Sequence, residues 1–398
     1  MQKRILKNGL TILFDKRKTD SVAINITGKV GSNNDKVRIL GLSHFLEHIL
    51  FEGTKKRTAI ELASEIEKVG GYTNASTSNE YTDYYAIVPS NYFDKALEIL
   101  ADMLINSKFE KKEIEKERQV ILDEISLHDD DPNTYQWILF SKCLFKKANA
   151  KNPVAGSYKS VSRATSQDIV KHFKRHYVPN NMVVSVSGNA KDVFDNVESK
   201  FGVLKRQKVP KYKDNKEPRD KKPTIKKEKK RINHSYLIIG YKAPTVKSRD
   251  TFAMEVIRAI LGKGQSSRLF NEIRTKRGLG YSVGAQYSAN LGFGYFASFV
   301  SADKKNIPKC REILLNEFKL AGLTRKEVEE AKRYIMGSSQ IRNEGNAERS
   351  EGNALFEMAE MSLKSYLKAI KAVKFEEVIK IAKKYFNGAY TEVFLEQR

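Results

Sequence analysis

The sequence predicts an α+β protein of two related α/β sandwich domains, each a mostly antiparallel sheet with helices packed on one face. Three observations support this fold class. The chain has 398 residues, more than one ordinary hydrophobic core contains, so two domains of about 200 residues each are expected. In each half, strand-like patterns come first and helix-like patterns follow. A strongly basic stretch that contains prolines separates the halves.

The first half opens with a β-hairpin signal and continues with strand and helix patterns. Lys7-Asn8-Gly9 lies between two short apolar runs, and Asn-Gly in that place favours a tight turn. Thr58 and Glu61 form a capping box that starts a helix. The expected strands are residues 3–6, 10–14, 21–30, 72–78, 81–88 and 182–187, and the expected helices are 41–52, 58–70, 91–106, 111–127, 166–176 and one ending at 201–202.

The second half repeats this order of elements without a recognisable repeat of sequence. Thr324 and Glu327 form another capping box. The expected strands are residues 232–241, 281–287 and 295–301, and the expected helices are 251–261, 307–321, one beginning at 266 and one beginning at 324. A repeated order of strands and helices predicts two domains of the same architecture.

The basic stretch covers residues 205–231, which contain fourteen Lys and Arg residues and only four Asp and Glu residues. Such a polar segment is typical of a solvated linker. We therefore expect domains at 1–204 and 232–398, joined by this linker. The formal net charge of the whole chain is +24, which also allows a nucleic-acid partner. Because much of the excess lies in the linker, we expect no nucleic-acid binding.

Hydropathy and cysteine content indicate the cellular compartment. The longest apolar runs have the length of strands, far below the roughly 20 residues that span a membrane. The first residues lack the apolar region of a secretion signal. The only cysteines, Cys143 and Cys310, lack paired spacing and are interpreted as small buried side chains in a reducing compartment. We therefore expect a cytoplasmic protein without a membrane partner.

A metal-binding motif lies in the expected helix 41–52. His44 and His48 are four residues apart, so on a helix they share one face and can bind one ion. Glu47 lies beside that face. The arrangement H-x-x-E-H is the inverted zinc-peptidase motif. Two neutral imidazoles can hold Zn²⁺ with an open position for water, and the adjacent carboxylate can act as general base.

The remaining histidines provide a comparison. His172 and His176 are also four residues apart on an expected helix, but Lys174 and Arg175 lie between them and would oppose a cation. We interpret this pair as structural. His128 and His234 stand in no ligand pattern and receive the same interpretation.

The motif and the Phe51-Glu52-Gly53-Thr54 that follows it resemble the pitrilysin/insulinase family, particularly its mitochondrial-processing-peptidase branch. That family takes its third zinc ligand from a helix some 75 residues downstream. Glu124 lies 76 residues after His48, and Glu117 lies seven residues, or about two turns, before Glu124. The resemblance implies one Zn²⁺ per chain, bound by His44, His48 and Glu124, with Glu117 orienting a histidine.

The resemblance also implies residues that handle the substrate. Residues 71–77 resemble the family's active-site edge strand, in which Asn74 and Ala75 would bind an extended peptide by strand addition. An ordinary strand with Asn at a bend is the alternative. Arg274 and Tyr281, seven residues apart, resemble the family's arginine–tyrosine signature. By resemblance, Arg274 contacts the substrate backbone and Tyr281 stabilises the oxyanion.

The function implied is that of a zinc metalloendopeptidase acting on peptides or unfolded polypeptide segments. Water activated by zinc would attack the peptide carbonyl, with Glu47 as general base and acid. In the two-domain branch a dimer closes the reaction chamber, so we expect a homodimer in which Arg274 and Tyr281 act in trans. A non-catalytic subunit of the same fold is the alternative, although such subunits usually lose ligands that this chain keeps.

Overall fold

The computed structural model describes residues 1–210, 217, 218 and 220–398. Contacts divide the chain into two compact units, and each unit takes segments from both halves of the sequence. The first unit comprises Met1–Ser126, Pro153–Lys213 and Ile341–Leu363, and the second comprises Leu127–Asn152, Asp214–Gln340 and Lys364–Arg398. The boundaries expected at residues 204 and 232 stay predictions.

The first unit contains a six-stranded mixed sheet in the order β1-β2-β6-β3-β5-β4. Among the described strands of this sheet, only β2 and β6 pair in parallel. The predicted hairpin is confirmed: β1 and β2 are antiparallel, and Gly9 in their turn has φ +88°, a conformation that glycine adopts without steric cost. The strands are β1 Gln2–Ile5, β2 Thr11–Lys16, β3 Ser21–Gly28, β4 Tyr72–Thr77, β5 Thr82–Pro89 and β6 Met182–Gly188.

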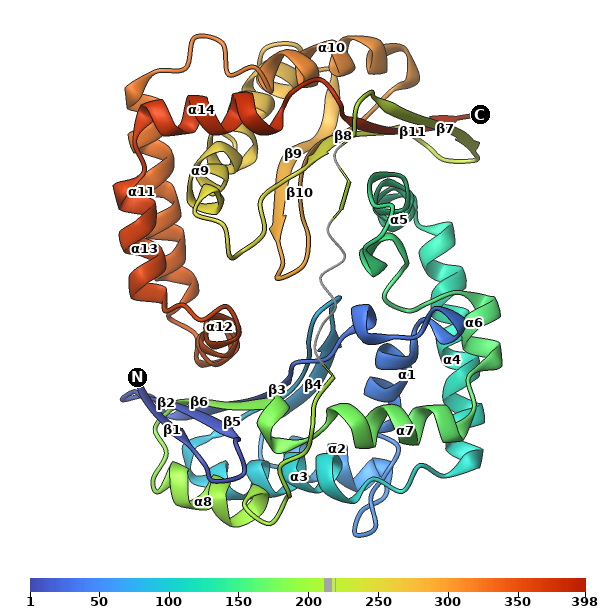
Figure 1. Ribbon diagram of the computed structural model, residues 1–398, viewed down its shortest axis with the longest axis vertical. Helices are drawn as coiled ribbons and strands as arrows, with labels where there is room; N and C mark the ends of the chain where they lie inside the picture. The colour runs from blue at the N-terminus through green and yellow to red at the C-terminus, as the bar shows by residue number, and fades with distance from the viewer. Residues whose placement is uncertain (211–216, 219) are drawn as a thin grey trace. The chain divides into compact units, whose positions relative to one another are not determined.

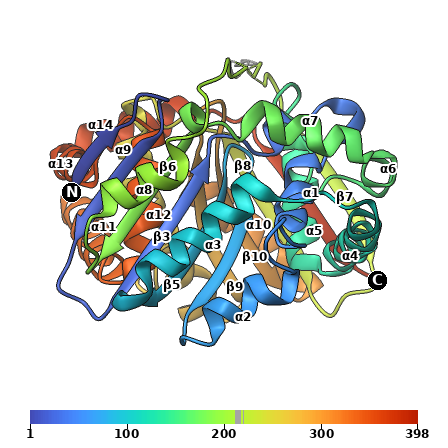
Figure 2. The same cartoon turned by 90° about the horizontal axis from the view of Figure 1, so that it is seen from below.

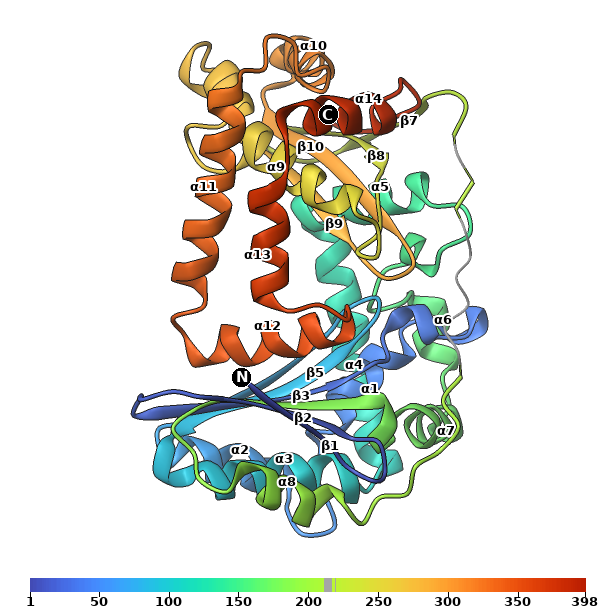
Figure 3. The same cartoon turned by 60° about the vertical axis from the view of Figure 1, so that its left-hand side comes forward.

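Helices cover both faces of this sheet. One face packs in the main core of the unit, under α3 and α8 among others (Figures 1 and 2). The opposite face carries α12 alone among the helices of the described part of this unit, across β3 and β6 (Figure 3). The helices are α1 Leu42–Ile49, α2 Ala59–Glu67, α3 Phe93–Asn106, α4 Lys111–Asp130, α6 Tyr158–Arg163, α7 Ser166–His176, α8 Val193–Phe201 and α12 Asn346–Met358.

The second unit contains a five-stranded sheet in the order β7-β11-β8-β10-β9, in which only β7 and β11 are parallel. One face packs against α9, α10 and α14, and α5 covers the opposite face through Leu139 and Phe140 (Figure 1). The elements are β7 Thr224–Lys230, β8 Ser235–Lys242, β9 Gly280–Ala289, β10 Gly294–Ala302, β11 Thr391–Gln397, α5 Pro132–Leu144, α9 Asp250–Gly262, α10 Ile307–Glu317, α11 Arg325–Arg342, α13 Leu363–Ala372 and α14 Phe375–Tyr385.

The predicted fold class is confirmed, with one addition. In the described part of the chain, each sheet carries a single helix on its second face, and that helix comes from the other half of the sequence: α12 in the first unit and α5 in the second. Polar contacts hold α12 in place, since Asn346 Nδ2 donates to Ser21 O at 2.9 Å and Arg349 pairs with Asp15. Neither helix was expected from the sequence.

Two local expectations need correction. Residues 224–230, placed in the linker, form the edge strand β7, whose lysine-rich side chains are mostly exposed. An edge strand tolerates such charge because it has one unpaired side and because lysines discourage further pairing. The helix expected from residue 266 is present but begins at Arg268 and continues as a π-helix at Phe270–Thr275. The middle of the expected linker, residues 211–216 and 219, lies outside the described residues.

No helix within the described residues combines the length and the apolar composition needed to cross a bilayer.

Candidate active site

Helix α1 carries the H-x-x-E-H motif on the face that points away from the core. Its apolar side chains Leu42, Phe45, Leu46 and Ile49 are all buried, with helical spacing. This burial orients the helix, so the motif residues emerge together on the opposite side, half-buried. A local apolar pattern therefore determines which way the motif faces.

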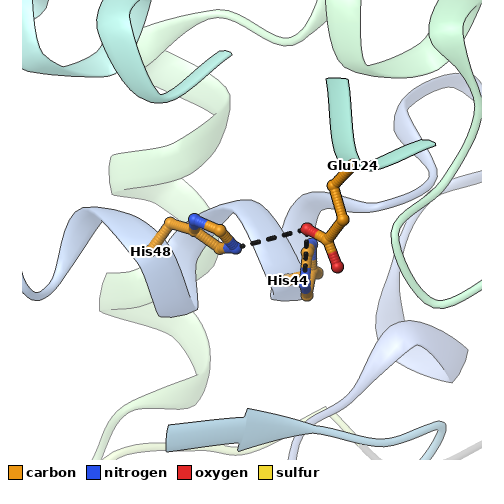
Figure 4. Close-up of side chains that lie close together, drawn as sticks. All are labelled: His44, His48 and Glu124. Atoms are coloured by element: carbon orange, nitrogen blue, oxygen red, sulfur yellow. Dashed lines mark ion pairs between the residues drawn. The ribbon is translucent and has the colours of Figure 1, made fainter. Parts of the chain in front are cut away.

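The third candidate ligand, the carboxylate of Glu124, comes from helix α4. Ile114, Ile121 and Leu122 anchor this helix in the core. Glu117 and Glu124, two turns apart, lie on one face, and that face meets α1. Glu124 Oε2 lies 3.6 Å from His44 Nε2 and 3.7 Å from His48 Nε2 (Figure 4).

These three side chains form a donor set that fits zinc. One ligand atom from each lies within 4.8 Å of the other two. Tetrahedral Zn²⁺ with bonds of about 2.0–2.2 Å holds its ligands roughly 3.3 Å apart, so small side-chain adjustments suffice. Two imidazoles and one carboxylate match the three protein ligands of catalytic zinc sites, which keep a fourth position open. Within the described residues, no other such group of three occurs.

Glu117 contacts His48 at the ring nitrogen opposite the one that faces Glu124. Its Oε2 lies 3.1 Å from His48 Nδ1, and its side chain is only 10% exposed. A carboxylate at this distance favours the tautomer with the proton on Nδ1, and the Nε2 atom of the same ring faces Glu124. The bond to His48 lowers the pKa of Glu117. Burial lowers the pKa of His48, but the bond to Glu117 and the nearby carboxylates outweigh burial and raise it.

Glu47 points from α1 toward the edge strand β4. Burial raises its pKa, while a hydrogen bond from the Thr77 side chain in β4 opposes that shift. Its Oε2 is buried and has no hydrogen-bond partner within the described residues. A carboxylate that holds a proton more readily, with one oxygen available, suits proton transfer. The contact with Thr77 was not expected from the sequence.

Strand β4 forms one edge of its sheet and pairs with β5 alone. The Ala75 N–H donates to the Asn74 side-chain oxygen at 2.8 Å, and Asn74 Nδ2 donates to the Tyr72 hydroxyl at 2.7 Å. Asn74 therefore occupies a backbone donor that a paired peptide would need. Strand addition at this position requires Asn74 to turn away and release that N–H.

Arg274 and Tyr281 belong to the second unit and contact each other. Arg274 Nη1 donates to Tyr281 O at 3.2 Å, and its guanidinium carbon lies 5.3 Å from the centre of the Tyr281 ring. Tyr281 is 76% exposed. The roles expected for these two residues stay predictions.

The histidine pair of α7 and the two cysteines lie outside the candidate metal site. Burial lowers the pKa of His172 to about 3 and that of His176 to about 4, so both rings are neutral. Cys143 and Cys310 are free thiols, and burial raises the pKa of each. A thiol with a raised pKa is a poor nucleophile.

Comparison with known families places the chain. The family model "Insulinase (Peptidase family M16)" matches residues 10–157, and the model "Peptidase M16 inactive domain" matches residues 163–335. An uncharacterized zinc protease of Rickettsia felis is 33% identical over 408 residues, covering 98% of this chain and 96% of that protein. One from Bacillus subtilis is 30% identical over 392 residues, covering 96% and 95%.

Comparison with solved structures points to the same family fold. A protease from Helicobacter pylori superposes with a TM-score of 0.94 at 25% identity and covers 99% of both chains. A peptidase M16 inactive-domain structure from Pseudomonas fluorescens has the same fold, with a TM-score of 0.90 at 19% identity, covering 100% of this chain and 98% of that one. The family suggested by the sequence motifs is confirmed: the chain belongs to the insulinase family of peptidases, family M16.

Proposed function

We propose that this chain is a zinc metalloendopeptidase that hydrolyses peptides or unfolded polypeptide segments. The observation that carries the proposal is the convergence of His44, His48 and Glu124 on one point, with Glu47 beside them. Relatives that match nearly the whole chain are named zinc proteases. A zinc ion bound by these residues would polarise the substrate carbonyl and lower the pKa of a bound water, so that it could act as a nucleophile at neutral pH.

The side chains of this chain divide the remaining work. His44, His48 and Glu124 hold the metal, and Glu117 keeps the His48 ring in its binding orientation. Glu47 accepts the proton of the attacking water and returns it to the leaving amine, a role its raised pKa supports. Strand β4 binds the extended peptide once Asn74 releases the Ala75 N–H.

We further propose that Tyr281 stabilises the oxyanion and that Arg274 contacts the substrate backbone. The exposed phenol of Tyr281 and its contact with Arg274 support this assignment. Removing one oxyanion donor typically costs about 10²–10³ in kcat. Tyr281→Phe is therefore expected to lower kcat by that factor while zinc content stays at the wild-type level, and Tyr158→Phe, at another exposed tyrosine, serves as the control. Wild-type kcat in Tyr281→Phe would contradict the role.

The proposal includes a homodimer in which Tyr281 of one subunit serves the metal site of the other. Co-refolding equal amounts of Glu47→Gln and Tyr281→Phe proteins tests this arrangement. If Tyr281 acts in trans, half of the dimers are mixed and each contains one complete site, so activity returns to about a quarter of wild type. If it acts in cis, no mixed dimer contains a complete site, and the mixture stays inactive.

Metal analysis combined with size-exclusion chromatography tests the assembly directly. We expect about one zinc per chain, as in catalytic sites of this type, in a species of twice the monomer mass. A monomeric species with full activity would exclude the dimer. The proposed location is the cytoplasm, which the two free cysteines support.

A further inference from the structure

Helix α1, which carries the H-x-x-E-H motif, is a short helix. It has eight residues, about two turns, and carries two proposed metal ligands and the proposed general base. Helices this short are unstable alone, so tertiary contacts decide where they lie. Gly41, at its N-cap, has φ +88° and no side chain to bond the first N–H groups. A contact from elsewhere in the chain must hold this end.

The carboxylate of Asp35 provides that contact. Asp35 Oδ2 accepts hydrogen bonds from the backbone N–H groups of Gly41 at 2.8 Å and Leu42 at 3.0 Å, and Oδ1 accepts from that of Ser43 at 3.0 Å. Asp35 is 4% exposed. The carboxyl group thus satisfies three N–H groups that the helix leaves unbonded. Burial raises the pKa of Asp35 to about 7, and its ionised form also interacts favourably with the positive end of the helix dipole.

Ser43 extends the contact to a second helix. Its Oγ lies 2.7 Å from Asp35 Oδ1, 2.9 Å from Gly31 O and 3.0 Å from His172 Nε2 in α7. A hydroxyl donates one hydrogen bond and accepts others, so Ser43 can donate to an oxygen and accept from a His172 Nε2–H. Ser43 immediately precedes the ligand His44 in sequence, and this network therefore anchors α1 next to the metal site.

The same segment, residues 31–35, also holds the end of β4. The Ser32 N–H donates to Ser78 O at 3.0 Å, and the Asn33 N–H donates to Asn79 O at 2.8 Å, in the turn that follows β4. At Gly31 the two backbone segments lie so close together that a Cβ would be 2.4 Å from Ser78 O. Residues 31–35 therefore connect the start of α1 with the strand proposed to bind substrate.

We propose that Asp35, assisted by Ser43, is a positioning residue that sets the metal ligands and Glu47 of α1 against β4. The inference rests on the proposed function for its consequence in catalysis, but the geometry of the metal site tests it independently. Asp35 touches neither metal nor substrate; it acts through the backbone of α1. Misplacing a catalytic group by about 1 Å can cost on the order of 100-fold in rate.

Asp35→Asn tests this role, because it replaces one accepting oxygen with an NH₂ group that faces backbone N–H donors. We expect weaker zinc binding by about tenfold, as for other residues that support metal ligands. The visible absorption bands of the cobalt-substituted protein should shift, because they report ligand geometry. We also expect kcat to fall by about 100-fold with KM within about threefold.

Ser43→Ala is the second variant. It removes the hydroxyl contacts but keeps the Asp35 bonds to the backbone. If Asp35→Asn does not fold, this variant tests the positioning role instead. We expect the same changes, smaller in size. The matched control is Thr58→Ala, which removes the N-cap of α2; it should lower the melting temperature and leave the cobalt spectrum and kcat unchanged. A folded Asp35→Asn protein with the wild-type cobalt spectrum and zinc affinity would overturn the proposal. If the wild-type protein binds zinc but cleaves no peptide, the proposed function fails, while the spectra still decide the role of Asp35.

Discussion

Glu47→Gln is expected to abolish peptide hydrolysis while the protein keeps about one zinc per chain. Glutamine preserves the size of the side chain and the ability to bond Thr77, but it cannot accept the proton of the attacking water. Positioned acid–base groups typically contribute about 10²–10⁴ in rate, so kcat should fall by at least that factor. Hydrolysis of a quenched fluorescent peptide, with zinc measured on the same sample, checks both parts.

The control is Glu67→Gln, which makes the same chemical change at an exposed glutamate at the end of α2. It should have wild-type activity. Substantial activity in purified, zinc-loaded Glu47→Gln protein would remove Glu47 from the mechanism. Loss of zinc together with activity would instead place Glu47 among the ligands, contrary to the geometry, in which Glu124 is the carboxylate that faces both imidazoles.

Glu124→Gln is expected to lose the metal itself. Its Oε2 faces both histidine nitrogens, and a neutral amide is a much weaker ligand for Zn²⁺ than a carboxylate. After dialysis against a chelator and return to stoichiometric zinc, the variant should hold far less than one zinc per chain. Because a ligand that binds the folded state stabilises it, zinc should raise the melting temperature of the wild type but not of Glu124→Gln.

Asp123→Asn gives a matched control, since Asp123 is the adjacent acid on α4 and its side chain is exposed. It should bind zinc and respond to it as the wild type does. Glu117→Gln should fall between the two, with zinc affinity reduced by about 10–100-fold, because it supports a ligand without being one. Full zinc content in Glu124→Gln would show that the third ligand lies elsewhere.

Elements defined by short-range patterns could be predicted well. The hairpin around Gly9 occurs where turn chemistry predicted it, and strands β4 and β5 pair at the positions expected for residues 72–78 and 81–88. The charged strand β7 was missed because its lysines outweighed every strand signal, although pairing with β11 stabilises it. Helices α5 and α12 were missed as well. Each belongs to the unit formed mainly by the other half of the sequence, and no local pattern indicates this.

By itself, the sequence determined the family and predicted the core of the site, because two histidines and a glutamate within one helical turn must share a surface wherever that helix lies. The assignment of Glu124 and Glu117 came from the family's spacing, and only the tertiary structure brings their helix against α1. Asp35 has no signature at all in the sequence. Its role depends on three backbone N–H groups that come together with it only when residues 31–43 are folded, and contacts of that kind are decided by three-dimensional packing.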